Sequence, residues 1–543
     1  MRTPGEKNWK KWGFDLEPQV SIFSAILITF FILFTVSNQQ EASAAFKTVQ
    51  NMVANLGGWF LILSANIFLG VMVYLAFSRF GSIRLGGAKA KPEFSTLSWY
   101  SMLMAAGMGI GLMFYSVAEP ILHFGAPPAL YSDVPGSPVA ARDAMALTFF
   151  HWGLHAWGIY SLVGLSLAFF AFNRGLPLTI RSVFAPLLGN AIYKWPGHLI
   201  DTLSVVATLF GLATSLGLGV GQVNAGLNFL FGIPFSVTIQ IILIAVITFL
   251  ATLSVVAGLD KGVRRLSELN MILAAFLLFF LLFVGPTIFL VSSFVQNIGH
   301  YISKLPALSF WTESFVDTVW QKDWTIFYWS WWISWSPFVG IFIARISKGR
   351  TVKEFILGVL FIPTILSFLW LSVFGGSAIF LELHGLADIT GAVNAGVEKA
   401  LFILLEQFPL SSITSLIGII LVAVFFITSS DSGSLVVDHL TSGGKLDSPV
   451  PQRIFWASLE GLIAAVLLLG GGLKALQTAA IATGLPFAIV LLIMCYSLIL
   501  GLSREWKNYG AEYLENLFPV HNKGEKVKPK PPNKKNKKIP VKK

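Results

Sequence analysis

The stretch FSVTIQIILIAVITFLATLSVVA, residues 235–257, decides the fold class because it runs for 23 residues without a charged side chain. About 20 consecutive apolar residues form a helix long enough to cross the ~30 Å hydrocarbon core of a membrane. Runs of this kind recur along the chain, which predicts an all-α polytopic membrane protein. We expect twelve transmembrane helices, at residues 20–37, 58–78, 98–117, 144–172, 202–231, 235–257, 270–295, 325–346, 354–378, 411–430, 453–471 and 478–501.

The composition of the 543-residue chain agrees with this fold class, since 55% of the residues are hydrophobic and only 12% are charged. Soluble proteins carry about 25% charged residues, so a soluble multidomain enzyme is excluded. A disordered chain would need the opposite composition. The single cysteine, Cys495, excludes a disulfide framework and any site with several cysteine ligands. The spans carry no metal cluster or nucleophile–base arrangement, so we do not expect an enzyme.

Lysine and arginine predict the orientation of the chain. If the N-terminus is cytoplasmic, 32 of the 38 basic residues fall on the cytoplasmic side, which positive charges favour. We therefore expect a multi-pass protein of the cell membrane with both termini in the cytoplasm. Residues 523–543 hold ten lysines and one acid, which predicts a disordered tail beside anionic lipid rather than a nucleic-acid interface. This tail is either a sensor of osmotic stress or a solvated segment with a topological role.

Gly107, Gly109 and Gly111 interrupt the span at 98–117. Glycine is costly inside a helix because it frees the backbone and exposes its polar groups. The alternate spacing does not match the small-xxx-small pattern of packed membrane helices. We expect an unwound segment whose N–H and C=O groups face a ligand; the alternative is close helix packing.

Aromatic residues form two groups inside the spans. Trp152, Trp157 and Tyr160 fall within one sector of the helix expected at 144–172, well inside the span rather than at its end, where an interfacial belt lies. The second group is WTIFYWSWWISW, residues 324–335, with five tryptophans in twelve residues.

In the second group, Trp331, Trp332 and Trp335 share one helical face, whereas Trp329 points away, and Pro337 is expected to disturb the helix. Two aromatic groups with no carboxylate nearby suit a methylated ammonium, which cannot donate hydrogen bonds and binds by cation–π contact. A carboxylate on the same molecule would bind the free N–H groups of an unwound helix. The residues alone therefore indicate a zwitterionic quaternary ammonium solute.

Thr428 and Ser429 lie in FFITSSDS, residues 425–432, at the end of the tenth span. Adjacent hydroxyls suit a hard monovalent cation, which prefers oxygen ligands. The alternative is that these hydroxyls satisfy backbone carbonyls or pack helices.

Ionisable residues inside membrane spans are rare and commonly functional. His151 and His155 either relay protons or hydrogen-bond between helices. Asp431 either supports ion coupling or is a capping acid, and Glu460 is given no role. Residues 296–323 are too polar to span, and we expect an amphipathic helix on the outer face or, alternatively, a plain loop.

At these residues the chain resembles the betaine/choline/carnitine transporter family. The resemblance covers about residues 15–500 and rests on AAGMGIGLMFY at 105–115, the first aromatic group, the tryptophan-rich segment 324–350 and residues 425–432. It implies a LeuT-type fold, in which two inverted five-helix repeats follow two additional N-terminal helices. The expected divisions are 1–19, a cytoplasmic segment; 20–97, the additional helices; 98–295, the first repeat; 296–323, the outer helix; 324–501, the second repeat; and 502–543, the basic tail.

The resemblance also implies residue roles. The implied substrate-binding residues are Trp152, Trp157, Tyr160, Trp331, Trp332, Trp335, Gly107, Gly109 and Gly111. The implied sodium ligands are the carbonyls of Ala105, Met108 and Phe425 and the hydroxyls of Thr428 and Ser429. Glycine at 111, where choline-transporting relatives typically have aspartate, favours betaine, which carries its own carboxylate. Leu212 departs from the family's second proposed sodium site.

The expected function is uptake of glycine betaine or a related zwitterionic compatible solute by sodium symport, for osmoprotection. Sodium would be the coupling ion, no other cofactor is expected, and the resemblance implies that trimers are common. The alternatives are proton-coupled or exchange transport of choline or carnitine, and sodium-coupled uptake of ectoine or proline.

Overall fold

The computed structural model describes residues 3–131, 134–257, 263–316, 319–445 and 447–517. Within them the chain is helical except for loops and an antiparallel hairpin of β1 (Trp9–Lys11) and β2 (Phe14–Leu16). The long helices are α1 (Pro18–Ser37), α2 (Gln39–Phe77), α8 (Trp195–Phe231), α9 (Val237–Ala257), α10 (Val263–Val284), α11 (Thr287–Phe310), α13 (Thr325–Ile346), α14 (Val352–Leu383), α17 (Ser411–Thr441) and α18 (Val450–Leu517). The shorter helices are η1 (Arg79–Ser82), α3 (Thr96–Gly107), α4 (Ile110–Gly125), α5 (Pro138–Trp152), α6 (Leu154–Phe172), η2 (Ile180–Phe184), α7 (Ala185–Leu188), η3 (Gly189–Tyr193), α12 (Trp320–Asp323), α15 (Ile389–Ala395), η4 (Val397–Lys399) and α16 (Ala400–Glu406).

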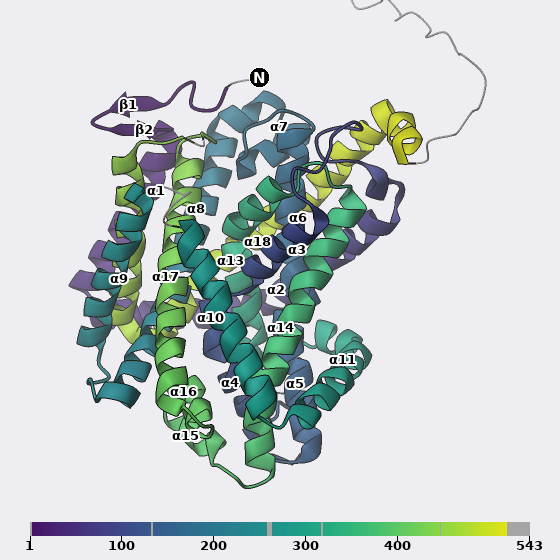
Figure 1. The fold of residues 1–543 in the computed structure, drawn as a ribbon. Coiled ribbons are helices and arrows are strands. Elements are labelled where there is room, and N and C mark those ends of the chain that lie inside the picture. The colour runs from purple at the N-terminus through teal and green to yellow at the C-terminus, as the bar shows by residue number, and fades with distance from the viewer. Residues whose placement is uncertain (1–2, 132–133, 258–262, 317–318, 446, 518–543) are drawn as a thin grey trace, which may run out of the picture.

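The long helices form one bundle (Figure 1). The β1–β2 hairpin, α7 and the last turns of α18 lie at one end, and α15 and α16 lie at the other. Among the described residues, nine helices are long and apolar enough to cross a membrane, or ten when α3 and α4 count as one bent span. The fold class is therefore confirmed as a nearly all-helical, multi-pass arrangement.

This count is lower than the twelve predicted spans for two reasons. The helix α18 counts once, although Gly471 and Gly472 leave helical geometry inside it, at φ 159° and 59°. The helix α13 is not counted, because its tryptophans and serines lower its hydropathy. The predicted end at 501 is also too early, since α18 continues to Leu517.

The structure corrects three predicted spans. The span at 98–117 is two helices, α3 and α4, which are bent by 62° and continue to Gly125. The span at 144–172 is also divided, into α5 and α6, at Gly153. The span at 270–295 ends early, at Val284, and the helix expected at 296–323 instead runs from Thr287 to Phe310.

Short polar side chains fix several helix starts. The carboxylate of Glu17 accepts from the N–H of Val20 at the start of α1, where Pro18 needs no hydrogen-bond acceptor. Thr351 and Glu354 form a reciprocal capping box at the start of α14. These caps satisfy N–H groups that the first helical turn leaves without partners.

The hairpin is tied to the start of α18 and the end of α17 through Asp15. Its carboxylate accepts from Lys445 at 2.6 Å and from Asn8 at 2.8 Å, and its N–H donates to Gln452 at 2.8 Å. The tail at 523–543, expected to be disordered, lies outside the described residues.

Candidate substrate and ion site

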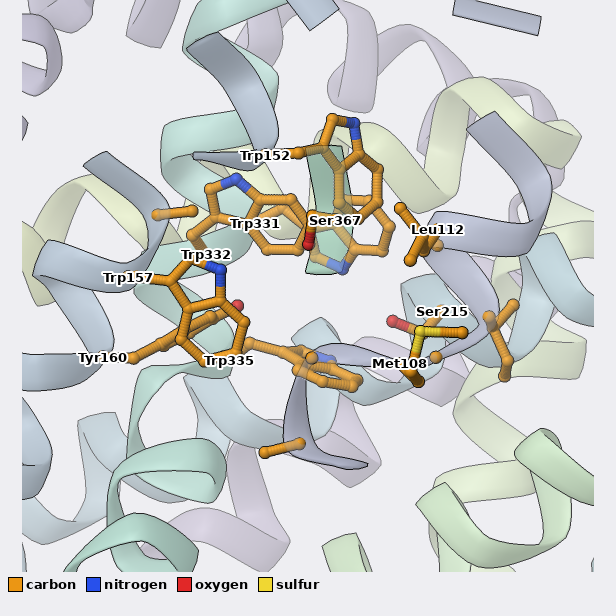
Figure 2. A pocket seen from close by; sticks show the side chains of 16 residues that line it. Met108, Leu112, Trp152, Trp157, Tyr160, Ser215, Trp331, Trp332, Trp335 and Ser367 are labelled. Carbon is orange, nitrogen blue, oxygen red and sulfur yellow. The ribbon is translucent and has the colours of Figure 1, made fainter. Parts of the chain in front are cut away.

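A central cavity lies where α3 and α4 meet α5, α6, α8, α13 and α14 (Figure 2). All nine predicted substrate-binding residues line it, although they come from positions 107 to 335 of the sequence. The remaining lining residues are Ala106, Met108, Ile110, Leu112, Ala156, Ser215 and Ser367.

The break between α3 and α4 forms one wall of this cavity. Met108 and Gly109 have extended backbone geometry, and no side chain caps the start of α4. The expected unwound segment is therefore present, but only over these two residues. Gly111 is already helical, and there the alternative interpretation applies: a Cβ on Gly111 would lie 2.6 Å from the Cη2 atom of Trp331.

A second break, at Gly153, shapes the opposite wall. A Cβ at Gly153 would lie 2.5 Å from the carbonyl oxygen of Phe149 and 2.9 Å from the ring of Phe368, so no side chain fits. Trp152 is the last residue of α5, whereas Trp157 and Tyr160 lie on α6. The prediction of one continuous helix is therefore wrong, but all three side chains line the cavity, as predicted.

The tryptophans of α13 complete the aromatic wall. Trp331 and Trp332 stack with ring centroids 4.7 Å apart and planes at 13°. Trp332 forms edge-to-face contacts with Trp152, at a distance of 4.9 Å between ring centroids, and with Tyr160, at 6.2 Å. Trp157 meets Tyr160 at 5.4 Å. These side chains are buried, so a cation among them would be shielded from water.

Pro337 does not break α13, contrary to expectation. Proline leaves the carbonyl four residues earlier without its helical donor. Here the Ser336 hydroxyl donates to that carbonyl, of Ile333, at 2.7 Å. The prediction for Trp329 is confirmed, since it packs against Phe150 and His155 outside the cavity.

A second cavity lies beside the first and shares Ala106, Met108 and Trp335 with it. Its lining includes all five predicted sodium ligands, Ala105, Met108, Phe425, Thr428 and Ser429. Thr428 Oγ1 donates to the carbonyls of Val424 at 3.0 Å and Phe425 at 3.2 Å, and accepts from Asn270 Nδ2 at 3.2 Å. Backbone bonding by this hydroxyl matches the alternative interpretation, and an ion would have to compete with it.

Sequence reasoning missed two groups at the substrate cavity. Ser367 of α14 supplies a hydroxyl from a helix that carries no recognisable motif. The expectation that no carboxylate lies near the aromatic groups is wrong, because Glu119 of α4 is fully buried and accepts from the Trp152 N–H at 2.8 Å. The predicted span ended at 117, which placed Glu119 outside it. The usable signal was an acid inside the apolar stretch 115–124.

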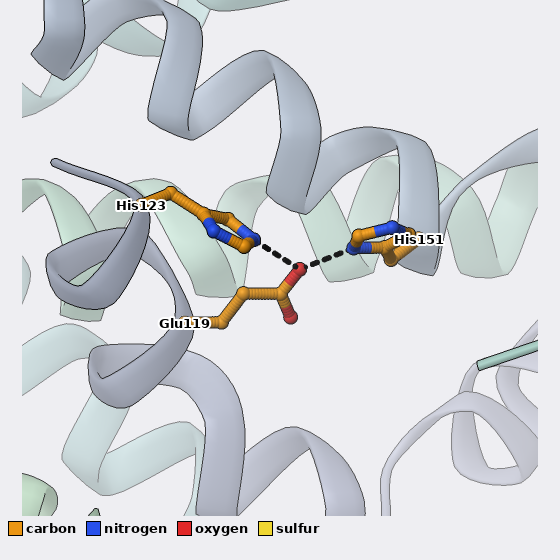
Figure 3. Close-up of side chains that lie close together, drawn as sticks. All are labelled: Glu119, His123 and His151. Atoms are coloured by element: carbon orange, nitrogen blue, oxygen red, sulfur yellow. Dashed lines mark hydrogen bonds and ion pairs between the residues drawn. The ribbon is translucent and has the colours of Figure 1, made fainter. Parts of the chain in front are cut away.

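Glu119, His123 and His151 form a buried cluster whose nearest ligand atoms lie within 4.8 Å of one another. Glu119 Oε1 lies 2.6 Å from His151 Nδ1 and 3.5 Å from His123 Nε2 (Figure 3). These ligand types can hold a divalent metal. The direct Glu119–His151 contact and the 3.0 Å contact between His151 Nε2 and Thr325 Oγ1 instead describe a hydrogen-bond network.

The other ionisable residues lie away from the cavity walls. His155 Nε2 contacts Asn66 Oδ1 at 2.9 Å, which fits a hydrogen bond between helices. Asp431 accepts from Ser254 at 2.7 Å, so it joins α17 to α9 rather than capping a loop. Glu460 is fully buried, and neither carboxylate oxygen has a partner among the described residues.

The sequence of this chain is similar to those of known transporters. Residues 19–507 match the family model described as betaine/carnitine/choline family transporter. Two similar proteins of Vibrio parahaemolyticus are a glycine betaine/proline/choline transporter, 49% identical over 91% of this chain and 91% of its own, and a glycine betaine/proline/choline/ectoine transporter, 48% identical over 93% and 90%. Glycine betaine transporter 1 of the same organism is 46% identical over 93% of this chain and 97% of its own.

Proposed function

Since the chain belongs to the betaine/carnitine/choline transporter family, whose members are transporters and not enzymes, we propose that it takes up glycine betaine or a related zwitterionic solute by sodium symport. The observation that carries this proposal is the cage of aromatic rings from α5, α6 and α13 around one cavity. A trimethylammonium group has no hydrogen-bond donor, and aromatic faces attract it through their quadrupoles.

The break between α3 and α4 supplies the complementary half of the zwitterion site. The helix α4 begins at Ile110, and the residues at its start, Gly109 to Leu112, line the cavity. A helix N-terminus favours negative charge, so the solute carboxylate would bind there while its cation enters the cage.

Sodium would bind in the neighbouring cavity, between the break and α17. The carbonyls of Ala105, Met108 and Phe425 and the hydroxyls of Thr428 and Ser429 offer five oxygen atoms, the ligand type that a hard cation prefers. Met108 lines both cavities, so ion binding would stabilise the backbone that holds the substrate. This shared residue is the proposed basis of coupling.

The finer fold assignment belongs to the same proposal. If α3 with α4, and α5 with α6, each form one span, and if α13 and both parts of α18 are also spans, the total is twelve. This total supports the proposed inverted-repeat fold. We propose the orientation predicted above, with both termini cytoplasmic. Osmoprotection, lipid contact of the tail and trimer assembly are parts of this proposal that uptake measurements on intact cells and native mass can test.

Uptake of radiolabelled glycine betaine into proteoliposomes containing the full chain tests the function. We expect accumulation that requires an inward sodium gradient, and a panel of unlabelled choline, carnitine, proline and ectoine would rank the substrates by competition. Accumulation driven only by a proton gradient would establish proton-coupled transport, and accumulation driven only by internal substrate would establish exchange. No transport of any of these solutes would overturn the proposal.

A further inference from the structure

One buried carboxylate holds two walls of the aromatic cage. Glu119 Oε2 accepts from the indole N–H of Trp152 at 2.8 Å and from the hydroxyl of Tyr328 at 2.5 Å. Its other oxygen, Oε1, faces His151 Nδ1 at 2.6 Å (Figure 3). Trp152 forms part of the cavity wall, whereas Glu119 and His151 do not line it.

The second wall is held through His151. The indole N–H of Trp332 donates to the backbone carbonyl of His151 at 3.0 Å. This carbonyl lies two residues before the break at Gly153, where α5 has ended and the regular helical bonding stops. Glu119 is therefore linked by one hydrogen bond to Trp152 and by His151 to Trp332.

Burying a carboxylate inside a membrane protein is costly unless several donors satisfy it. An indole N–H and a tyrosine hydroxyl both donate to Glu119, and these neutral donors leave its negative charge uncompensated. Among the described residues, the cationic partners that it has are His151 and His123, and they are cationic only when protonated. A negative charge at the far edge of the Trp152 ring would strengthen attraction for a cation on the ring's cavity side, because the Coulomb energy is large at low dielectric constant.

We infer that Glu119 is the positioning residue of the cage: it fixes the Trp152 and Trp332 rings by hydrogen bonds and places a negative charge behind them for a quaternary ammonium substrate. This inference rests on the proposed function, because it requires that the cage bind a methylated ammonium. It differs from the proposed function in assigning part of the affinity to a residue that does not touch the substrate.

Equilibrium binding of radiolabelled glycine betaine to the full-length protein in lipid nanodiscs tests the inference. Glu119→Gln keeps the size of the side chain and an oxygen that accepts from Trp152, but it removes the charge. We expect its Kd to rise about tenfold, the effect of ~1.4 kcal/mol, while the maximum number of bound sites stays unchanged. Glu460→Gln removes another fully buried carboxylate, outside both cavities, and its Kd should stay within about twofold of wild type.

A double-mutant cycle separates action through Trp152 from a general structural effect. If Glu119 acts through this ring, Glu119→Gln should weaken binding much less in a Trp152→Phe background than in wild type, because phenylalanine has no N–H to hold. Equal losses in the two backgrounds, or a wild-type Kd for Glu119→Gln, would overturn the inference. If Glu119→Gln does not give a monodisperse protein, Glu119→Asp in the same cycle keeps the charge but shortens the side chain, which moves the carboxylate away from Trp152. Additive losses there would overturn the inference equally.

The outcome for wild type distinguishes the two proposals. Glycine betaine binding by wild type together with an unaffected Glu119→Gln variant means that only the positioning inference fails. Absence of binding by wild type to glycine betaine, choline, carnitine, proline and ectoine means that the proposed function itself fails.

Discussion

Gly111 lies directly against Trp331, so closely that a Cβ on the glycine would be 2.6 Å from the Cη2 atom of the indole. The same added atom would lie 3.1 Å from the indole ring of Trp152. Any side chain at this position therefore displaces a ring of the cage. The absence of an aspartate here, first interpreted through charge, has a steric basis as well.

Gly111→Ala should raise the KM for glycine betaine about tenfold, because overpacking a well-packed site commonly costs about 1–3 kcal/mol. Gly109→Ala is the matched comparison, since no atom lies within 4 Å of its added Cβ and its φ of −171° suits any residue. Its KM should rise less than that of Gly111→Ala. Initial uptake rates over a range of betaine concentrations measure both, and the reverse order would contradict the packing argument.

Trp332→Leu should weaken betaine binding at least tenfold, because it removes a cation–π partner worth about 2 kcal/mol when desolvated. Trp332→Phe retains an aromatic face but loses the N–H that donates to the His151 carbonyl. Its affinity should fall between those of wild type and the leucine variant. Calorimetric titration would report the three values, and equal affinities for leucine and phenylalanine would argue against the cage.

Thr428→Val should raise the sodium concentration for half-maximal uptake about tenfold, the effect of ~1.4 kcal/mol, because it removes one of the five proposed oxygen ligands of the ion. Thr414→Val provides the control, because this buried threonine of the same helix also donates to backbone carbonyls but lies outside the second cavity. It should leave the sodium dependence unchanged. Similar shifts in both variants would mean that helix stability, rather than ion binding, is affected.

Asp15→Asn should release the N-terminal hairpin. Burial raises the pKa of Asp15, but the hydrogen bonds from Lys445 and Asn8 outweigh burial and leave the pKa below its ordinary value of 3.8. The ionised form is thus the one that stabilises docking, so this contribution is present at neutral pH and is lost as the pH falls below about 4. Trypsin cleavage at Lys7, Lys10 and Lys11 should become several-fold faster in the variant.

The control for this experiment is Glu93→Gln, which removes an exposed ion pair with Lys348. Exposed pairs contribute little to stability, so cleavage at the hairpin should be unchanged. Equal cleavage of wild type and Asp15→Asn would show that other contacts hold the hairpin.

The residue types at the two cavities could be predicted because aromatic rings, glycines and paired hydroxyls are chemically unusual inside apolar spans. The positions where helices break could be predicted less well. Gly109 was found through its glycine-rich surroundings, whereas Gly153 was not, because only the contact with Phe149 and Phe368 excludes a side chain there. Long apolar runs predicted both ends of α9 and the start of α17. They did not predict the end of α17, which continues to Thr441 rather than stopping at 430, or the end of α10, which depends on where the chain turns at Pro286.

Glu119 was also missed because the end of a helix was not predicted correctly. The predicted span ended at residue 117, two residues before Glu119, whereas α4 continues to Gly125 and buries Glu119 within it. Its partner Tyr328 was hidden among the tryptophans of α13, where composition alone gave no reason to single it out.

The Trp152 and Trp332 rings are held by hydrogen bonds to groups outside the cavity, the Glu119 carboxylate and the His151 carbonyl. Other residues that line the cavity can therefore change without moving these rings. Ser215 and Ser367 line the same space, and their hydroxyls hold no ring in place. Exchanging these two serines could then change which zwitterion fits without disturbing the ammonium cage. The solute specificity of this transporter can therefore change through small residues while the aromatic cage stays the same.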